Sequence, residues 1–389
     1  MSQAERPGAE LVSAMTRWRR YLHAHPEFGF EEKRTAAFVA ARLREFGLDE
    51  VVEGVGGTGV VGTLRRGTRN RAVALRADMD ALRITEAGTR DHRSEVPGTM
   101  HACGHDGHTA MLLGAARHLA EAGGFDGMVR FVFQPAEEWG QGALAMLRDG
   151  LMQRFPFDEI YGLHNMPGLP VGAVQSRAGA FMSAEDIFAV DLKGVGGHAS
   201  RPHWGREVLV AACALVMDLQ TIVSRRLSPT DIAVVSATEL TTDGTRNVLP
   251  GQARVAGDAR SFEPAVSAAI ERELRRIAAG IAVTYDCTAD VTYTREFVPL
   301  RNDPALVEAA LAAVRAVPGA IASHAAEPMT ASEDFARFLD HVPGAFLFVG
   351  NGEGSAPLHN PSYDFNDAAL PFGMGLHAAI VRHRLPANG

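Results

Sequence analysis

The stretch Met100–Thr109, with the sequence MHACGHDGHT, places three histidines, one cysteine and one aspartate within ten residues. Imidazole and thiolate are the side chains that best hold borderline-soft divalent metals in proteins. Apolar residues then recur at intervals of three and four, the spacing of one helix face; they are Met111, Leu112, Ala115, Ala116 and Leu119. The stretch predicts a metal site in a turn that leads into a helix N-terminus. A polar turn with incidental histidines is the alternative.

Other segments place polar side chains at the ends of short apolar runs. They are the run 72–77 before Asp80, the run 129–133 before Glu137 and Glu138, and the run 159–163 before His164. Because ligands bind at the carboxyl ends of strands in open parallel α/β sheets, we expect these segments to meet at one edge of a sheet.

The carboxylates in these segments have different expected roles. Glu137 and Glu138 can divide the work, one binding metal and the other staying free as a proton carrier. A solvated pair on a helix first turn is the alternative. A metal-ligating histidine needs a second acceptor for its other ring nitrogen, and Asp80 suits that role. An aspartate that only caps a turn is equally compatible with the sequence.

Bulk composition excludes several functional classes. A net charge of -8 argues against nucleic-acid partners and anionic membranes. The three cysteines are odd in number and widely spaced, which suits a reducing compartment rather than a disulfide framework. The N-terminal MSQAERPGAE lacks the pattern of a secretory signal, and no run approaches the ~18 apolar residues of a membrane span. We therefore expect a cytoplasmic protein without a membrane partner.

The length of 389 residues and a change of pattern near residue 183 indicate two domains. From there, strands at 186–192, 232–240, 253–259 and 281–293 alternate with helices at 207–223 and 265–279, the β-α-β-β-α-β order of a ferredoxin-like sandwich. We predict this inserted α+β domain at 183–295. Residues 1–182 and 296–389 are expected to form a discontinuous α/β catalytic domain, with a mostly parallel sheet flanked by helices.

Motifs along nearly the whole chain resemble one family. They are LHAHPEFGFEE, ALRADMDAL, MHACGHDGHTAMLLGAA, FQPAEE, GLHNMP, GVGGHASRPHWG, NVLPG, SEDF and LHNPSYDFND, in the family's order. Together they resemble the amidohydrolase branch of the dinuclear metallo-aminoacylase and carboxypeptidase family, which includes hippurate hydrolases and auxin–amino-acid conjugate hydrolases. The resemblance implies a zinc-peptidase-like catalytic domain and a lid domain.

The resemblance also implies roles for individual residues of the catalytic domain. Cys103 would bridge two divalent ions, with His105 and His164 completing one site, and Glu138 and His359 the other. Glu137 would be the general base toward a metal-bridging water and later the proton donor to the leaving amine. Zn²⁺ or Mn²⁺ is favoured for this mixed donor set, with Ni²⁺ or Co²⁺ as alternatives.

Three residues of the inserted domain receive roles by the same resemblance. His198 would reach the substrate's carbonyl oxygen, in related enzymes across a dimer interface, and Asn247 and Arg260 would contact the substrate's carboxylate. The chain is therefore expected to form a homodimer through the lid domain. Arg83, Trp139 and Ala331 depart from the family's usual residues, and the first two are expected to alter the acyl pocket.

The expected reaction is metal-dependent hydrolysis of N-acyl-L-amino acids, with N-acetyl, N-benzoyl or similar acyl groups, to a carboxylic acid and a free amino acid. A dipeptidase or carboxypeptidase acting on small peptides is the first alternative, although no acidic partner for a free amino group is evident in the sequence. A non-catalytic small-molecule-binding module is the second alternative, and the complete set of ligands together with Glu137 argues against it.

Overall fold

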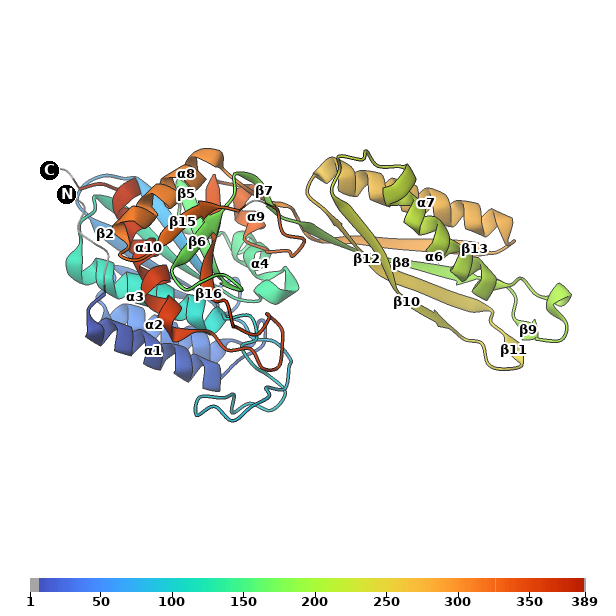
Figure 1. Ribbon diagram of the computed structural model, residues 1–389, viewed down its shortest axis with the longest axis horizontal. Coiled ribbons are helices and arrows are strands. Elements are labelled where there is room, and N and C mark those ends of the chain that lie inside the picture. Colours follow the sequence, from blue (N-terminus) through green and yellow to red (C-terminus); the bar gives the residue numbers. More distant parts are fainter. Residues whose placement is uncertain (1–6, 326, 388–389) are drawn as a thin grey trace. The chain divides into compact units, whose positions relative to one another are not determined.

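The computed structural model describes residues 7–325 and 327–387, and these form two compact units (Figure 1). Unit 1 spans 1–179, 301–327 and 333–389, and unit 2 spans 180–300 and 328–332. The domain limits expected from the sequence lie three and five residues from these boundaries. Residues 328–332, expected in the catalytic domain, group with unit 2 instead. Residues 1–6, which bear on the expected absence of a signal peptide, lie outside the described residues.

Unit 1 contains a mixed sheet of eight strands in the order β1-β2-β4-β3-β5-β16-β6-β15. The strands are β1 (Glu50–Val55), β2 (Gly59–Arg66), β3 (Ala72–Asp78), β4 (Gly127–Gln134), β5 (Glu159–Pro167), β6 (Ala173–Ser176), β15 (Ile321–His324) and β16 (Gly344–Gly352). The central neighbours β4, β3, β5 and β16 run parallel, so their carboxyl ends share one edge. The predicted α/β class is confirmed.

Helices cover the sheet of unit 1 (Figure 1). They are α1 (Ala9–Ala24), α2 (Lys33–Glu45), α3 (His105–Ala122), α4 (Gly142–Arg148), α5 (Leu151–Arg154), α8 (Pro304–Ala313), α9 (Ala336–Leu339) and α10 (Leu370–Arg384). One core cluster joins the sheet to α1, α2, α3, α8 and α10. On the other face, Phe335 and Phe346 lie over Gly162, where a Cβ would come within 2.6 Å of the Phe346 ring. The sheet is therefore buried on both faces, as a parallel sheet requires.

Unit 2 is an antiparallel sheet in the order β10-β12-β8-β13 with two helices. The elements are β8 (Ala184–Lys193), α6 (Val208–Arg225), β10 (Ala233–Thr242), β12 (Gln252–Ser261), α7 (Pro264–Thr284) and β13 (Thr288–Phe297). Phe188, Val190 and Leu192 of β8 point into one core with both helices, while Ile187 is exposed. This period-two alternation explains why the ferredoxin-like prediction is confirmed.

One predicted element of unit 2 is partly wrong. The strand expected over 281–293 begins only at Thr288, because residues 281–284 form the last turn of α7. Ile281 is buried with the other apolar residues of that helix, whereas Val283 is 84% exposed. The run of β-branched residues suggested a strand, but helical packing of Ile281 decides its conformation. Asp286, at φ 51°, forms the turn between the two elements.

Helix α6 is the one helix within the described part of the chain whose length and composition would let it cross a membrane. Its residues Val208, Ala211, Leu215 and Leu219 are buried in the core of unit 2, the pattern of an amphipathic core helix. This helix is therefore weak evidence for a membrane segment.

Candidate metal centre and catalytic site

The predicted site residues of unit 1 meet at the carboxyl edge of the parallel strands. Asp80 follows β3, Glu137 and Glu138 follow β4, and His164 lies in β5. Cys103 lies in the loop just before α3, which begins at His105. Gly104 between them has φ 91°, and a Cβ there would come within 2.3 Å of the Asn165 amide. The turn that joins the Cys103 thiol to the His105 imidazole therefore requires glycine at position 104.

Two groups of donor atoms could each hold a cation, and they share Cys103. The donor atoms of Cys103, His105 and His164 lie within 4.8 Å of one another, and those of Cys103, Glu138 and His359 do the same. The Cys103 sulfur is 3.3 Å from Nε2 of His164, and Nε2 of His359 is 3.3 Å from Oε1 of Glu138. Thiolate, imidazole and carboxylate are the donors expected of a dinuclear Zn²⁺ or Mn²⁺ centre.

The ligating ends of two of these side chains have no hydrogen-bond partner among the described residues. Nε2 of His105 and Oε1 of Glu138 are both buried, and Oε1 of Glu138 has an ion-pair contact with Nε2 of His359. Buried polar atoms normally find a partner because leaving one unsatisfied costs about 1–3 kcal/mol. A bound cation would satisfy both atoms, so the residues present fit a metal centre.

The opposite ring nitrogens are oriented by hydrogen bonds. Nδ1 of His105 is 3.1 Å from Oδ1 of Asp80, and Nδ1 of His164 is 2.6 Å from the carbonyl oxygen of Asn165. Each ring then carries its proton on Nδ1 and leaves Nε2 free to bind metal. Asp80 thus has the second-acceptor geometry expected of it. His108 differs because Asp78 and the Asn165 backbone amide occupy both of its nitrogens.

Electrostatics also favour a cation at this centre. Burial and the carboxylates of Glu138 and Glu137 raise the pKa of the Cys103 thiol well above its ordinary value. Although burial opposes protonation of His105, its carboxylate neighbours, Asp78 foremost, raise its pKa to about 10. The surrounding negative charge therefore attracts a positive partner, and a divalent cation would reverse both shifts by stabilising thiolate and neutral imidazole.

Glu137 is buried and lies within reach of both ligand groups. Its carboxylate belongs to a group with His105 and Glu138 whose donor atoms lie within 4.8 Å of one another. Burial, followed by the charges of Glu333 and Glu138, holds its pKa well above the ordinary value. Glu138 behaves differently: burial is outweighed by His359 and His105, which lower its pKa. The adjacent glutamates are thus electrostatically distinct: the surroundings shift the pKa of Glu137 upward and that of Glu138 downward.

His198, Asn247 and Arg260 lie in unit 2, and its fold brings only the first two together. The exposed His198 is in β9 (Gly197–His198), and the amide of Ala199 donates to the Asn247 carbonyl oxygen. Asn247 precedes the first residue of β12, Gln252, whereas Arg260 lies near the last residue of that strand. There Arg260 contacts Glu185, Asp258 and Ser332. The eight positions from Gln252 to Arg260 correspond to about 26 Å of strand.

Three buried charged residues beside Glu137 received no role from the sequence: Arg76, Glu333 and Asp334. The Arg76 guanidinium lies 2.8 Å from Glu333 and 3.2 Å from Asp334. An arginine inside the apolar run 72–77 was the available signal, because a fully buried arginine needs acidic partners.

A second network, also without an assigned role, lies under the N-terminus of α3. Nδ1 of His23 is 2.8 Å from Asp106, and Arg19 contacts Asp106, Asp364 and Asp367. These contacts join α1 to the start of α3 and to the segment 364–367, which fits a structural role for His23.

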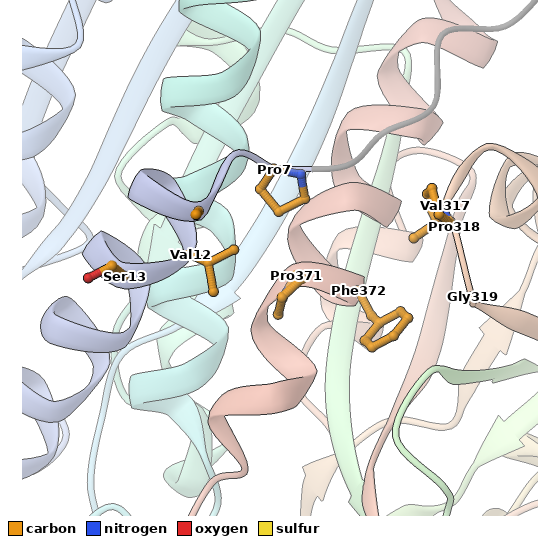
Figure 2. Close-up of a pocket in the computed structure, with 9 residues that line it drawn as sticks. Pro7, Val12, Ser13, Val317, Pro318, Gly319, Pro371 and Phe372 are labelled. Atoms are coloured by element: carbon orange, nitrogen blue, oxygen red, sulfur yellow. The ribbon is translucent and has the colours of Figure 1, made fainter.

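An apolar hollow of about 790 Å³ lies elsewhere in unit 1 (Figure 2). Figure 2 shows Val12 and Ser13 on α1 next to Pro371 and Phe372 on α10, with Val317, Pro318 and Gly319 on the facing loop. None of the nine lining residues is titratable, and none belongs to the donor groups. The hollow therefore has no part in the candidate centre.

Known proteins resemble the chain over nearly its full length. The model of peptidase family M20/M25/M40 matches residues 74–383. The hippurate hydrolase of Campylobacter jejuni is 37% identical over 96% of this chain and 97% of its own. An N-acetyl-L-cysteine deacetylase of Bacillus subtilis is 36% identical over 90% and 83%. The solved structure of a dinuclear metal-binding M20 peptidase from Bacillus subtilis has a TM-score of 0.85 at 32% identity, covering 97% of this chain and 99% of that one.

Proposed function

We propose that this chain, which belongs to peptidase family M20/M25/M40, hydrolyses N-acyl-L-amino acids to a carboxylic acid and the free amino acid. The chain is a metal-dependent amidohydrolase, in agreement with relatives that are named for removing acyl groups from amino acids. The observation that carries the proposal is the pair of donor groups that share Cys103, with the buried Glu137 beside them and in neither group.

We propose that two divalent cations are held by the chain, one by Cys103, His105 and His164 and the other by Cys103, Glu138 and His359. When bound, such a pair lowers the pKa of a water molecule and polarises the scissile carbonyl group. Zn²⁺ or Mn²⁺ is our proposal for the resident metal, since the donor set mixes sulfur, nitrogen and oxygen.

Glu137 acts as the general base and then as the general acid. Its carboxylate takes the proton of the attacking water, holds it in a buried environment that favours the neutral form, and donates it to the leaving amine. The electrostatic contrast with Glu138 supports this division, because burial and acidic neighbours raise the pKa of Glu137 alone of the two.

His198 is proposed to stabilise the developing negative charge on the carbonyl oxygen. The backbone amide of Ser200 donates to its Nδ1 at 3.1 Å, so the neutral ring carries its proton on Nε2. That leaves a donor aimed away from the turn, as an oxyanion contact requires. Asn247 and Arg260 are proposed to bind the substrate's carboxylate, and Arg260 must then exchange contacts with its acidic neighbours Glu185 and Asp258.

We further propose a homodimer in which His198 serves the partner's centre. Within unit 2, His198 and Arg260 are too far apart to touch one small substrate, so both act on it only if they come from different subunits. Unit 2 also presents an edge strand, β10, and exposed apolar residues on α6, features common at interfaces; the residues are Leu209, Val210, Met217 and Val223. A cytoplasmic location without nucleic-acid or membrane partners remains our expectation.

The test is turnover by protein stripped of metal and reconstituted separately with Zn²⁺, Mn²⁺, Co²⁺ or Ni²⁺. Substrates would be N-acetyl, N-benzoyl and longer N-acyl amino acids, with the matching free dipeptides as controls. We expect metal-dependent cleavage of the blocked amino acids only. Cleavage of free dipeptides alone would move the assignment to a peptidase, and no cleavage of any substrate by any metal form would contradict the proposal.

A further inference from the structure

The loop between β4 and α4 carries both Glu137 and Glu138, and its regular secondary structure is one 3₁₀ turn, Glu137–Trp139. It leaves β4 at Gln134 and enters α4 at Gly142. Ala136, just before the two glutamates, has φ 46°, in the left-handed region that costs a non-glycine residue energy. Within the loop, the amide of Gly142 donates to the carbonyl oxygen of Ala136 at 3.1 Å, and groups from neighbouring segments supply further contacts.

Three buried carboxylates from other segments hold the loop. Glu32 accepts the amide of Ala136 at 2.8 Å, and Asp80 accepts the amide of Glu138 at 3.1 Å. The third carboxylate is Asp334, which is 1% exposed and comes from the segment after β15. Each of the first two fixes one point of the loop, whereas Asp334 contacts both of its ends.

Asp334 joins the two ends of the loop through separate oxygen atoms. Its Oδ1 accepts the side-chain amide of Gln134 at 2.6 Å, and its Oδ2 accepts the backbone amide of Ala143 at 2.9 Å. Gln134 is the last residue of β4, and Ala143 lies in the first turn of α4. The carboxylate therefore closes the loop at its base and sets the distance between strand and helix.

Asp334 could instead be considered a ligand of a further cation, since its carboxylate groups with those of Glu137 and Glu333. Arg76 already supplies the positive charge there, with Nη2 2.8 Å from Glu333 and 3.2 Å from Asp334. Both Asp334 oxygens are also occupied by donors. A cation would have to displace this buried guanidinium, so positioning is the role that fits the contacts.

We infer that Asp334 is a positioning residue for Glu137 and Glu138, acting through the hydrogen bonds that join Gln134 to Ala143. This inference rests on the proposed function, because it assigns Asp334 to the placement of the catalytic base. It does not touch substrate. Its loss should therefore reduce kcat and leave KM nearly unchanged, since a misplacement of about 1 Å can cost about 100-fold in rate.

The experiment compares two variants that break the same bond from opposite sides. Asp334→Asn removes one acceptor and the charge. Gln134→Met removes the donor, together with the oxygen that accepts from Nε of Arg76, and leaves the charge of Asp334 in place. With saturating metal, we expect both to lower the plateau kcat about tenfold or more, with KM within about twofold of wild type. The double variant should lose little more than either single one, because both changes remove the same Gln134–Asp334 hydrogen bond.

A matched control separates positioning from lost stability. Asp126 is another buried aspartate, and its Oδ1 accepts the backbone amides of Thr68 and Arg69 in a loop without site residues. Asp126→Asn should keep kcat. If Asp334→Asn and Gln134→Met both keep the wild-type plateau kcat, or only shift the pH profile, the inference is wrong.

Amide hydrogen exchange of the wild type and these variants gives a second readout that does not depend on turnover. Faster exchange confined to residues 135–143 in Asp334→Asn and Gln134→Met supports the inference even if no substrate of the panel is cleaved, an outcome that would contradict only the proposed function. Unchanged exchange in that loop overturns the positioning role. Should Asp334→Asn fail to fold, Gln134→Met alone decides between these outcomes.

Discussion

The centre of unit 1 and the His198 turn of unit 2 place their functional side chains in opposite ways. Around Cys103, the imidazoles of His105 and His164 are buried and each is fixed by a second acceptor. The side chain of His198 is exposed, and its hydrogen bonds to described residues are with Ser200, two residues along the chain. The first region is preorganised, whereas the second is an exposed side chain on a separate unit.

The difference shows how the chemistry is distributed over the chain. Metal binding and proton transfer need fixed distances, which the carboxyl edge of a buried parallel sheet provides. Stabilisation of a transition state by a residue on a separate unit allows substrate to enter before the site is complete. We therefore expect changes in unit 1 to abolish chemistry within one chain, and changes at His198 to be corrected by a second chain.

The largest effect is expected for Glu137→Gln. The amide cannot take or hold the proton of the attacking water, so kcat should fall by about 10⁴-fold, the upper range for a general base. Metal content should stay at the wild-type value, because Glu137 is not a proposed ligand. Steady-state kinetics and elemental analysis of the same preparation measure both quantities, and substantial residual kcat would contradict the role of base.

The matched change within the same centre is Cys103→Ser. Serine lacks the thiolate shared by the two donor groups, so we expect this variant to lose metal as well as activity. Unchanged metal stoichiometry would argue against a bridging cysteine. The pair of variants thus separates proton transfer from metal binding.

The next effect tests the second region directly. His198→Ala should lower kcat by about 10²- to 10³-fold, as removal of one oxyanion donor does. Mixing this variant with Glu137→Gln should restore activity through hybrid dimers in which one centre has both groups. Absence of recovery after subunit exchange has been verified would mean that each site is built within one chain.

A smaller effect concerns the stability of the preorganised region. Burial opposes protonation of His23, yet Asp106 raises its pKa from the ordinary 6.5 to about 9. The contact of protonated His23 with Asp106 therefore contributes its full stabilisation below pH 6.5. This contribution is lost as the pH rises through 9. Between these values the wild type should lose up to about 3 kcal/mol more unfolding free energy than His23→Gln does.

Urea unfolding at several pH values between 6.5 and 9 measures this difference. His383→Gln, a change at an exposed histidine of α10, serves as the control and should keep the wild-type dependence. Parallel curves for the wild type and His23→Gln would show that the His23–Asp106 contact does not stabilise the fold of unit 1.

The smallest effect is expected at the rim of the first region. Trp139 follows Glu138, is 48% exposed, and packs edge-on against Phe28 at 5.0 Å, with Arg83 4.1 Å over the same ring. Trp139→Ala should change the ratio of kcat/KM for N-benzoyl and N-acetyl substrates by about 10-fold, the range for lost apolar contacts. An unchanged ratio would remove Trp139 from the acyl pocket.

Much of the fold followed from local patterns in the sequence. The strands that end at Asp78, Gln134 and in the His164 segment have apolar runs bounded by polar residues, and the order of elements in unit 2 gave the ferredoxin-like topology. The predicted end of α7 was wrong because residues 281–284 are equally suited to a strand. Only packing against the core of unit 2 selects the helix. Such ambiguous apolar runs need tertiary contacts to resolve them.

The amino-acid sequence by itself determined the chemistry available to this protein: thiolate, imidazole and paired carboxylates in motifs that resemble one family of amidohydrolases. Only the tertiary structure decided which histidines have a free ring nitrogen and which glutamate has a raised pKa. It also decided that Asp334 joins the ends of the loop that carries Glu137 and Glu138. The physical reason is that ligand identity is local in sequence, whereas hydrogen-bond satisfaction and burial depend on segments as distant as Gln134 and Asp334.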